Sequence, residues 1–376
     1  MILQALGVYV HLPFCDVKCA YCDFYSIARR HVDEDVWQRY RARLLQELKE
    51  KSENLQGKPV SLFFGGGTPS KAPPYIIGDL IEAVAKLPGA QLKEVTMEAN
   101  PESLQSQNLK QLKSYGLNRV SVGIQSTSAE ILKYLGRLYN EKSYREVFEK
   151  LQNAGIHNYS ADFILGTPGL KLEQVFKDLN WALQGQVKHI SAYTLTVEPD
   201  TMLEAAIKSG RQRKSSDRRL WLQQIKVAEF LHERGFKQYE VSNYALKNYQ
   251  SLHNQLYWKY RQYIGLGVSA HSFLNGKRTA NVKSLEKYLN GTASLVETAK
   301  PEIDFFIGSL RLTGKQSLLQ LKRLLGEQKY KDFLNIAQDL QRRNLIQIQN
   351  LHFQMTEKGL MNADQLLKEI TDALAS

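Results

Sequence analysis

Residues 7–24 read GVYVHLPFCDVKCAYCDF, an apolar run that leads directly into a loop carrying Cys15, Cys19 and Cys22. These are all the cysteines of the chain, and they are too crowded to form a disulfide framework. A closed zinc site would need a fourth ligand, for which only His11 lies near. An iron–sulfur cluster with one open iron needs three thiolates and no fourth residue, so the spacing favours such a cluster over zinc.

Six short runs of the kind found in strands buried on both faces follow one another along the chain. They span residues 7–12, 59–64, 93–99, 119–124, 159–165 and 189–195. Helical stretches alternate with them, at 37–51, 104–115, 142–154 and 171–184. Three helices end in a glycine that suits a left-handed C-cap: Gly116, Gly155 and Gly235.

This alternation of strands and helices predicts a parallel sheet with right-handed crossovers. We therefore predict an α/β fold, a partial (β/α)6 barrel, with its chemistry at the carboxyl ends of the strands. The cysteine loop follows the first strand and lies at that end.

The pattern changes after about residue 290, where three helical stretches, a hairpin around Asn350 and a last helix follow. The helices are expected at 302–312, 316–325, 328–343 and 359–374. The order resembles a small winged-helix-like module, so we predict two domains, 1–290 and 291–376. The expected wing, IQNLHF at 348–353, carries no Lys or Arg, and a structural use of the module is at least as well supported as DNA binding.

Charge and hydropathy limit the classes of partner. The 376 residues carry a formal charge of +12, but the positive charge is spread out and its densest cluster is the short segment 211–219. Nucleic acid is therefore not an expected partner, and peripheral contact with an anionic membrane stays open. Neither a leader peptide nor a membrane-spanning run is recognisable, so we expect the protein in the cytoplasm.

The cysteine spacing resembles a known signature, because CxxxCxxC with the aromatic Tyr21 before the last cysteine is typical of radical S-adenosylmethionine proteins. The resemblance implies a [4Fe-4S] cluster whose open iron binds S-adenosylmethionine through its amino and carboxylate groups. One electron from the cluster then cleaves the cofactor to a 5'-deoxyadenosyl radical, so a reductant such as a flavodoxin or ferredoxin is expected.

Two segments after the cysteines carry candidate cofactor contacts. The sequence GGGTPS at 65–70 follows the second strand, and its backbone N–H groups could face a ligand. The resemblance implies that Gly66, Gly67 and Thr68 contact the methionine amino group. Glu98 lies at the end of the third strand. The resemblance implies that its carboxylate accepts hydrogen bonds from both ribose hydroxyls of the cofactor.

Further polar residues stand at the following strands. Gln125 ends the fourth strand, and Asp162 lies inside an apolar run, where an unpaired charge is costly. A guanidinium such as that of Arg137 can pair with the methionine carboxylate. The resemblance adds Tyr9 and Tyr21 as adenine and methionine contacts, although each of these residues alone could be an ordinary polar contact of the core.

The chain is similar almost throughout to the oxygen-independent coproporphyrinogen III oxidase family. The segments that carry this similarity are 9–15, 189–201, 238–245, 253–258 and 263–273.

Three features favour the haem-chaperone branch of that family over the decarboxylating oxidase. Phe24 stands where the oxidase has a fourth cysteine, and only fourteen residues precede Cys15. HNQLYW at 253–258 matches the HNxxYW motif of the haem-chaperone branch. The match implies that His253 contacts haem, with the neighbouring aromatic side chains on the macrocycle.

The leading hypothesis is thus a haem chaperone that binds haem, the cluster and S-adenosylmethionine, and delivers haem to acceptor haem proteins. The alternative is an enzyme that converts coproporphyrinogen III to protoporphyrinogen IX. Coproporphyrinogen oxidation is not expected, whether the cofactor is cleaved at all stays open, and a homodimer is possible. His189 and His271 adjoin strands and are interpreted as core or pocket histidines.

Overall fold

The computed structural model describes residues 4–53, 55, 57–138, 140–297 and 300–375. Its centre is a run of six parallel strands that neighbour one another in chain order. They are β1 (Gln4–Leu12), β4 (Gly57–Gly66), β5 (Glu94–Ala99), β6 (Arg119–Gln125), β7 (Tyr159–Leu165) and β8 (His189–Thr194). These are the six predicted strands, and the predicted α/β class with a partial barrel is confirmed.

Short strands extend this sheet at both edges. Beside β1 lies β11 (Tyr263–Leu266), also parallel, and then β12 (His271–Leu274), β13 (Lys277–Ala280) and β14 (Leu295–Glu297), which pair antiparallel. Beside β8 lie β10 (Asn243–Ala245) and β9 (Lys237–Gln238), again antiparallel. The curved sheet therefore stays open between β9 and β14 in the described part of the chain.

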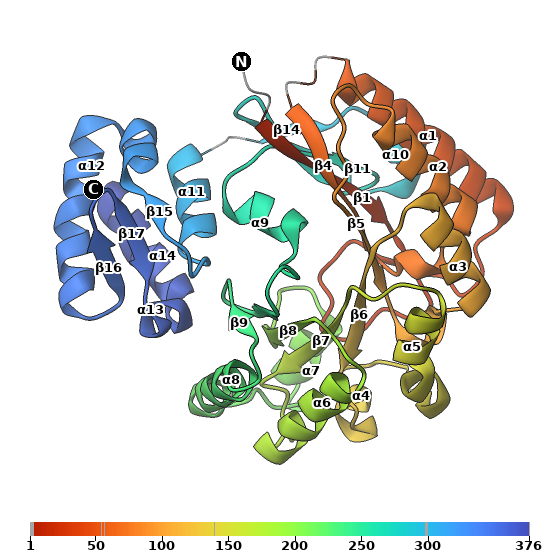
Figure 1. The fold of residues 1–376 in the computed structure, drawn as a ribbon, viewed down its shortest axis with the longest axis horizontal. Coiled ribbons are helices and arrows are strands. Elements are labelled where there is room, and N and C mark those ends of the chain that lie inside the picture. Colours follow the sequence, from red (N-terminus) through yellow and green to blue (C-terminus); the bar gives the residue numbers. More distant parts are fainter. Residues whose placement is uncertain (1–3, 54, 56, 139, 298–299, 376) are drawn as a thin grey trace.

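Helices cover the outer face of the sheet (Figure 1). They are α1 (Glu34–Ser52), α2 (Pro74–Ala85), α3 (Ser106–Tyr115), α5 (Glu141–Asn153), α6 (Leu172–Gln184) and α8 (Asp217–His232). The expected left-handed glycines are confirmed, with φ of 111° at Gly116, 74° at Gly155 and 81° at Gly235. Side chains such as Val8, Leu62 and Val122 are fully buried between sheet and helices, as the apolar runs predicted.

Shorter elements complete the barrel region. The cysteine segment forms β2 (Phe14–Cys15), which pairs with β3 (Ile27–Ala28). Single turns and short helices follow several strands: η1 (Pro69–Lys71), η2 (Pro101–Ser103), α4 (Ala129–Tyr134), α7 (Met202–Lys208), α9 (Leu252–Trp258) and α10 (Leu285–Leu289). None of the helices in the described part of the chain has the length and apolar composition needed to span a bilayer.

The C-terminal region is helical with a small antiparallel sheet, as predicted. It comprises α11 (Pro301–Ser309), β15 (Gln316–Ser317), α12 (Leu318–Arg342), β16 (Ile346–Gln349), β17 (His352–Met355), α13 (Glu357–Met361) and α14 (Ala363–Ala375). The two helices expected at 316–325 and 328–343 are confirmed within α12, because the backbone between them leaves the helical conformation at Gly326, which has a φ of 73°. The helix expected at 359–374 is divided at Asn362, where α13 ends.

Two separate hydrophobic clusters underlie these regions. Tyr288 is the last buried residue of the barrel cluster, and Phe305 is the first of the C-terminal cluster. On that ground we propose the division into residues 1–290 and 291–376.

The two regions meet where α11 packs on α9. At Gly308 an added Cβ would lie 2.3 Å from the carbonyl oxygen of Trp258, so only glycine allows this approach. Through this contact the C-terminal region lies beside α9, at one side of the barrel (Figure 1).

We predict that Gly308→Val lowers the free energy of unfolding by about 1–3 kcal/mol, because the added methyl groups must push the two helices apart. Urea denaturation measures the change. Gly314→Val is the matched control, because Gly314 has open space where a Cβ would lie. Equal stabilities of the two variants would contradict the packing argument.

Candidate functional site

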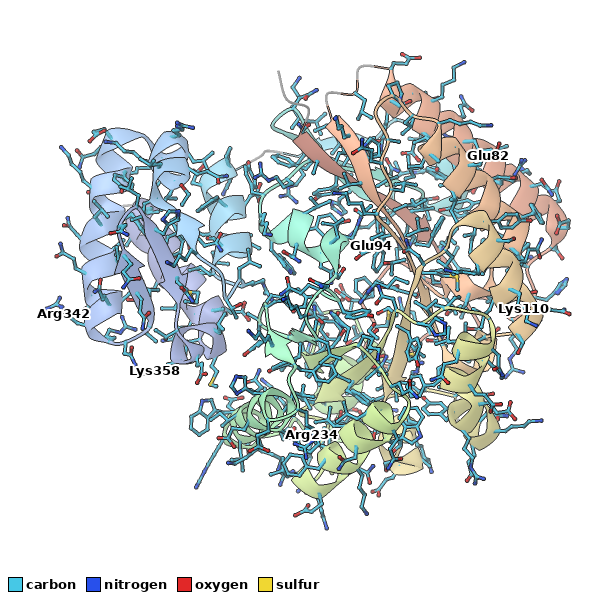
Figure 2. All side chains as sticks on the ribbon, in the orientation of Figure 1. Glu82, Glu94, Lys110, Arg234, Arg342 and Lys358 are labelled. Carbon is cyan, nitrogen blue, oxygen red and sulfur yellow. The ribbon has the colours of Figure 1, made fainter. Side chains whose placement is uncertain are left out.

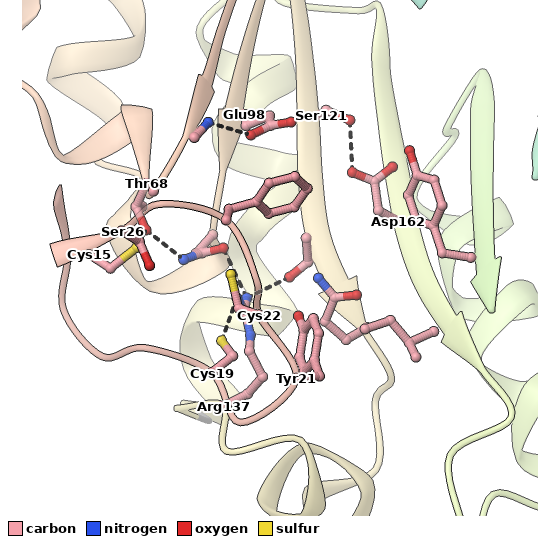
Figure 3. Close-up of a pocket in the computed structure, with 18 of the residues that line it drawn as sticks. Cys15, Cys19, Tyr21, Cys22, Ser26, Thr68, Glu98, Ser121, Arg137 and Asp162 are labelled. Atoms are coloured by element: carbon pink, nitrogen blue, oxygen red, sulfur yellow. Dashed lines mark hydrogen bonds between the residues drawn. The ribbon is translucent and has the colours of Figure 1, made fainter. Parts of the chain in front are cut away.

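The three cysteines lie on the loop after β1 and face one cavity of about 440 Å³ (Figure 3). The hydroxyl of Thr68 donates to the sulfur of Cys15 at 3.4 Å, and the guanidinium of Arg137 lies 3.8 Å from the sulfur of Cys19. The N–H of Cys22 donates to the carbonyl of Cys19 at 3.2 Å. All three thiols are half-buried.

The raised pKa values of two of these thiols indicate that their thiolates need a cationic partner. Burial, assisted by the neighbouring thiols, raises the pKa of Cys22 to about 11, and burial also raises the pKa of Cys15. Thiolates in this setting need the positive charge of bound metal. Within the described residues no three His, Cys, Asp or Glu side chains meet closely enough to hold a single metal ion. The three thiols surround a cavity instead, which fits a cluster with one thiolate for each of three irons.

The glycine segment after β4 is docked on the cysteine segment. The N–H groups of Gly67 and Thr68 donate to the carbonyls of Leu12 and Phe14 at 2.8 and 2.9 Å. A Cβ at Gly67 would lie 2.7 Å from the backbone of Pro13. This glycine is therefore required by the approach of two backbones, in addition to any approach of a ligand that the sequence suggested.

Two half-buried carboxylates, Glu98 and Asp162, line the cavity. Glu98 accepts from the N–H of Gly66 at 3.3 Å, and burial together with the charge of Asp162 raises the pKa of Glu98 to about 7. Asp162 accepts from the hydroxyls of Ser191 and Ser121 at 2.6 and 2.8 Å. The expected pairing of Asp162 is thus provided by hydroxyl groups.

Arg137 reaches the cavity from the turn after α4. Its guanidinium donates to the side-chain oxygen of Asn100 at 2.9 Å and to the carbonyl of Gly123 at 2.8 Å. Gln125 ends β6 with a φ of 66°, and its side chain turns into the same cavity. Both residues therefore stand at the carboxyl ends of the strands.

Eight of the ten predicted cofactor-binding residues line this cavity: Tyr21, Gly66, Gly67, Thr68, Glu98, Gln125, Arg137 and Asp162. Tyr9 does not, because its hydroxyl pairs with Nδ1 of His11 at 3.0 Å and it faces a second cavity of about 740 Å³.

His253 lines neither cavity. It is buried against β1 and β4, with Nδ1 2.9 Å from the Ser61 hydroxyl and Nε2 2.8 Å from the Tyr257 hydroxyl. Its ring stacks on Phe63 at 5.0 Å, and burial lowers its pKa to about 3, so the ring is neutral at physiological pH. The predicted haem contact of His253 stays a prediction.

The sequence analysis missed several polar residues of the cavity: Asn100, Arg119, Ser121, Ser191 and Asn254. Arg119 is the most informative, because it is buried with its Nε unpaired among the described residues, and its charge opposes the pKa rise of both Glu98 and Asp162. The signal was present, since Arg119 and Ser121 alternate with apolar residues in a strand predicted to be buried.

The fold and the site together define a radical S-adenosylmethionine protein. The profile of the Radical SAM superfamily matches residues 9–182. Heme chaperone HemW of Bacillus subtilis is 30% identical over 96% of this chain and 97% of its own length. Heme chaperone HemW of Escherichia coli is 34% identical over 82% of this chain and 83% of its own. The chain belongs to the HemW family.

A solved structure supports the fold. Coproporphyrinogen III oxidase (HemN) from Escherichia coli superposes with a TM-score of 0.80, covering 99% of this chain and 90% of its own, at 21% identity. Membership of the radical SAM superfamily makes the [4Fe-4S] cluster and S-adenosylmethionine the cofactors of this chain, as the cysteine spacing predicted.

The raised pKa of Glu98 predicts a pH-dependent stability. The folded state holds the Glu98 proton more tightly than the unfolded state, whose pKa is near 4.5, so stability falls as pH rises from about 4.5 to 7. Glu98→Gln removes this penalty and should stabilise the cofactor-free protein by about 1–2 kcal/mol at pH 8, since solvent in the cavity screens part of the effect. The gain should vanish toward pH 4.5.

Urea denaturation of wild type and variant at both pH values measures this difference. Glu82→Gln is the matched control, because Glu82 lies on the surface of α2 beside Lys86, where the pKa is lowered instead (Figure 2). A gain for Glu98→Gln that is the same at both pH values would contradict the assignment.

Proposed function

We propose that this chain is a cytoplasmic haem chaperone, which binds haem and delivers it to acceptor haem proteins. The observation that carries the proposal is the placement of HNQLYW on α9. Tyr257 and Trp258 of this helix line the second cavity, while Asn254 lines the cavity of the cysteines. One motif thus connects a large aromatic cavity to the cofactor site, in a chain related over most of its length to proteins named Heme chaperone HemW.

Hydrogen bonds to Glu94 fix the position of α9. The carboxylate of Glu94 accepts from the N–H groups of Leu252 and His253 at 2.7 and 3.0 Å, and so caps the helix from within the barrel (Figure 2). The hydrogen bond from His253 to Tyr257 then orients the aromatic side chain that faces the second cavity. In this arrangement His253 acts on haem through Tyr257, and direct contact would require it to leave its buried position.

The residues of the first cavity are proposed to hold the cofactors. Cys15, Cys19 and Cys22 bind the cluster, and the cluster with S-adenosylmethionine on its open iron supplies one-electron chemistry. Arg137 faces the methionine carboxylate and Glu98 the ribose hydroxyls. The remaining proposed contacts in this cavity are Tyr21, Gly66, Gly67, Thr68, Gln125 and Asp162. The adenine contact of Tyr9, which faces the second cavity, stays a prediction.

Partners beyond haem are also proposals. A reductant such as a flavodoxin or ferredoxin would reduce the cluster by one electron. We also propose that the chain forms a homodimer. Any contact with an anionic membrane would be peripheral.

We predict that the anaerobically reconstituted protein binds one haem per chain and forms no protoporphyrinogen IX. Absorbance titration measures haem binding. Incubation with coproporphyrinogen III, S-adenosylmethionine and dithionite, followed by chromatography of the porphyrins, measures turnover. Turnover without a stable haem complex would overturn the proposal and favour the alternative, a coproporphyrinogen III oxidase.

A second prediction concerns the cofactor contacts. Arg137→Gln should weaken S-adenosylmethionine binding about 10- to 100-fold, the effect of losing a charge-assisted hydrogen bond of about 1.5–3 kcal/mol. Calorimetry on reconstituted protein measures the affinity, and iron content confirms that the cluster is intact. Arg234→Gln on the surface after α8 is the control (Figure 2). Unchanged affinity with an intact cluster would remove Arg137 from the proposed contacts.

A further inference from the structure

Gln125, a proposed contact of S-adenosylmethionine, stands at the centre of a tight turn at the end of β6. Its φ of 66° lies in the left-handed region, which few residues other than glycine occupy. The N–H of Ser126 donates to the carbonyl of Ile124 at 2.8 Å and closes a three-residue turn around Gln125. A three-residue turn with a positive φ is the rare and strained form, so neighbouring structure must hold it in place.

The turn brings the amide of Gln125 back over its own strand. A Cβ at Gly123 would lie 2.9 Å from Nε2 of Gln125 and 3.6 Å from the guanidinium of Arg137. The pairing of β6 with β7 also shifts by one residue between Gly123 and Gln125, as expected where an extra residue bends a strand. The amide therefore lies close to Arg137, and both side chains line the first cavity.

A buried carboxylate on α6 holds the segment that follows the turn. Asp178 is 3% exposed and accepts from the Ser126 hydroxyl at 2.7 Å. It also accepts from the N–H and the hydroxyl of Thr127 at 3.0 and 2.6 Å. Gln174, one helical turn earlier, donates to the same carboxylate at 2.7 Å and to the Thr127 hydroxyl at 3.1 Å. Both residues that follow Gln125 are therefore fixed to α6.

The residue before the turn is held from a second helix. The hydroxyl of Tyr144 on α5 donates at 3.0 Å to the carbonyl of Ile124, which is the carbonyl that closes the turn. Gln125 is therefore flanked on both sides by backbone that is tied to a helix. A strained conformation persists where the surrounding structure fixes it in this way.

The partners of Asp178 indicate what its burial is for. Within the described part of the chain, its hydrogen bonds go to Ser126, Thr127 and Gln174, and no Lys or Arg forms an ion pair with it. A carboxylate that is buried without a cation is costly unless several donors compensate it. Here most of those donors belong to the loop after Gln125, so the carboxylate fixes the conformation of that loop.

We propose that Asp178 is a positioning residue for S-adenosylmethionine, because it holds the strained turn that aims Gln125 into the first cavity. The inference rests on the proposed contact between Gln125 and the cofactor. It adds to the site a residue of α6 that does not itself line the cavity. Asp178 acts on the cofactor only through Gln125.

The test is a double-mutant cycle on the reconstituted full-length protein, with the affinity for S-adenosylmethionine measured by calorimetry. Gln125→Ala should weaken binding about 10-fold, the upper range for the loss of one hydrogen bond, and Asp178→Asn about 3-fold. Asp178→Asn should have no further effect in the Gln125→Ala background, because its action passes through that side chain. Glu173→Gln, exposed on the same helix, is the matched control.

Iron content and circular dichroism confirm that each variant is folded and holds its cluster. If Asp178→Asn does not fold, Thr127→Val replaces it in the cycle, since it removes the hydroxyl that donates to Asp178 and keeps the shape of the side chain. Thr127→Val should likewise weaken binding only where Gln125 is present.

The outcomes separate the cofactor contact from the positioning role. Unchanged affinity in Gln125→Ala would remove Gln125 from the proposed contacts and the role of Asp178 with it. A weakened Gln125→Ala with an Asp178→Asn effect that persists in the double variant would overturn the positioning role alone. Unchanged affinity in Asp178→Asn would do the same.

The strain in the turn is tested in the cofactor-free protein. Gln125→Gly should melt about 1–3 °C above Gln125→Ala, because glycine adopts a positive φ without a steric penalty. At Gln111, inside α3, the order of the two variants should be reversed, because glycine is the poorer helix former. Equal melting temperatures for the two variants at position 125 would contradict the strained turn and, with it, the need for Asp178 to hold it.

Discussion

The docking of the cysteine segment on the glycine loop is the constraint on which the rest of the site depends. The hydrogen bonds from Gly67 and Thr68 to the carbonyls of Leu12 and Phe14 fix the start of the cysteine loop against the end of β4. Thr68 then reaches the sulfur of Cys15, and the remaining thiols follow around the cavity. A side chain at Gly67 would clash with the backbone of Pro13, so this docking requires glycine.

Behind this loop the barrel holds charges that would be unfavourable without their neighbours. Asp162 is stabilised by hydroxyl groups and Glu98 by a single backbone N–H, while the guanidinium of Arg119 lies close to both. The pKa of Glu98 is therefore raised to about 7. Its carboxylate lines the cavity, where it can accept hydrogen bonds from hydroxyl groups of a ligand.

The second cavity is formed by segments that lie far apart in the sequence. Its walls come from β1, the cysteine loop, α9, the strands β11 to β13, and α11, which are separated by up to some three hundred residues along the chain. Glu94 caps α9 at one end, and Gly308 allows α11 to pack against the other end. The C-terminal region thus supplies one wall of this cavity, through α11.

The sequence by itself determined the six strands, the helix-ending glycines and the cysteine spacing, because each depends on neighbours within a few residues. The family resemblance carried by its motifs also implied eight cofactor contacts that line the first cavity, and the shared carboxyl edge of parallel strands explains why such residues meet. Only the tertiary structure decided that His253 is buried between Ser61 and Tyr257, and that His271 faces an open aromatic cavity. Burial and hydrogen-bond partners of a side chain are set by contacts between distant segments, which no local pattern records.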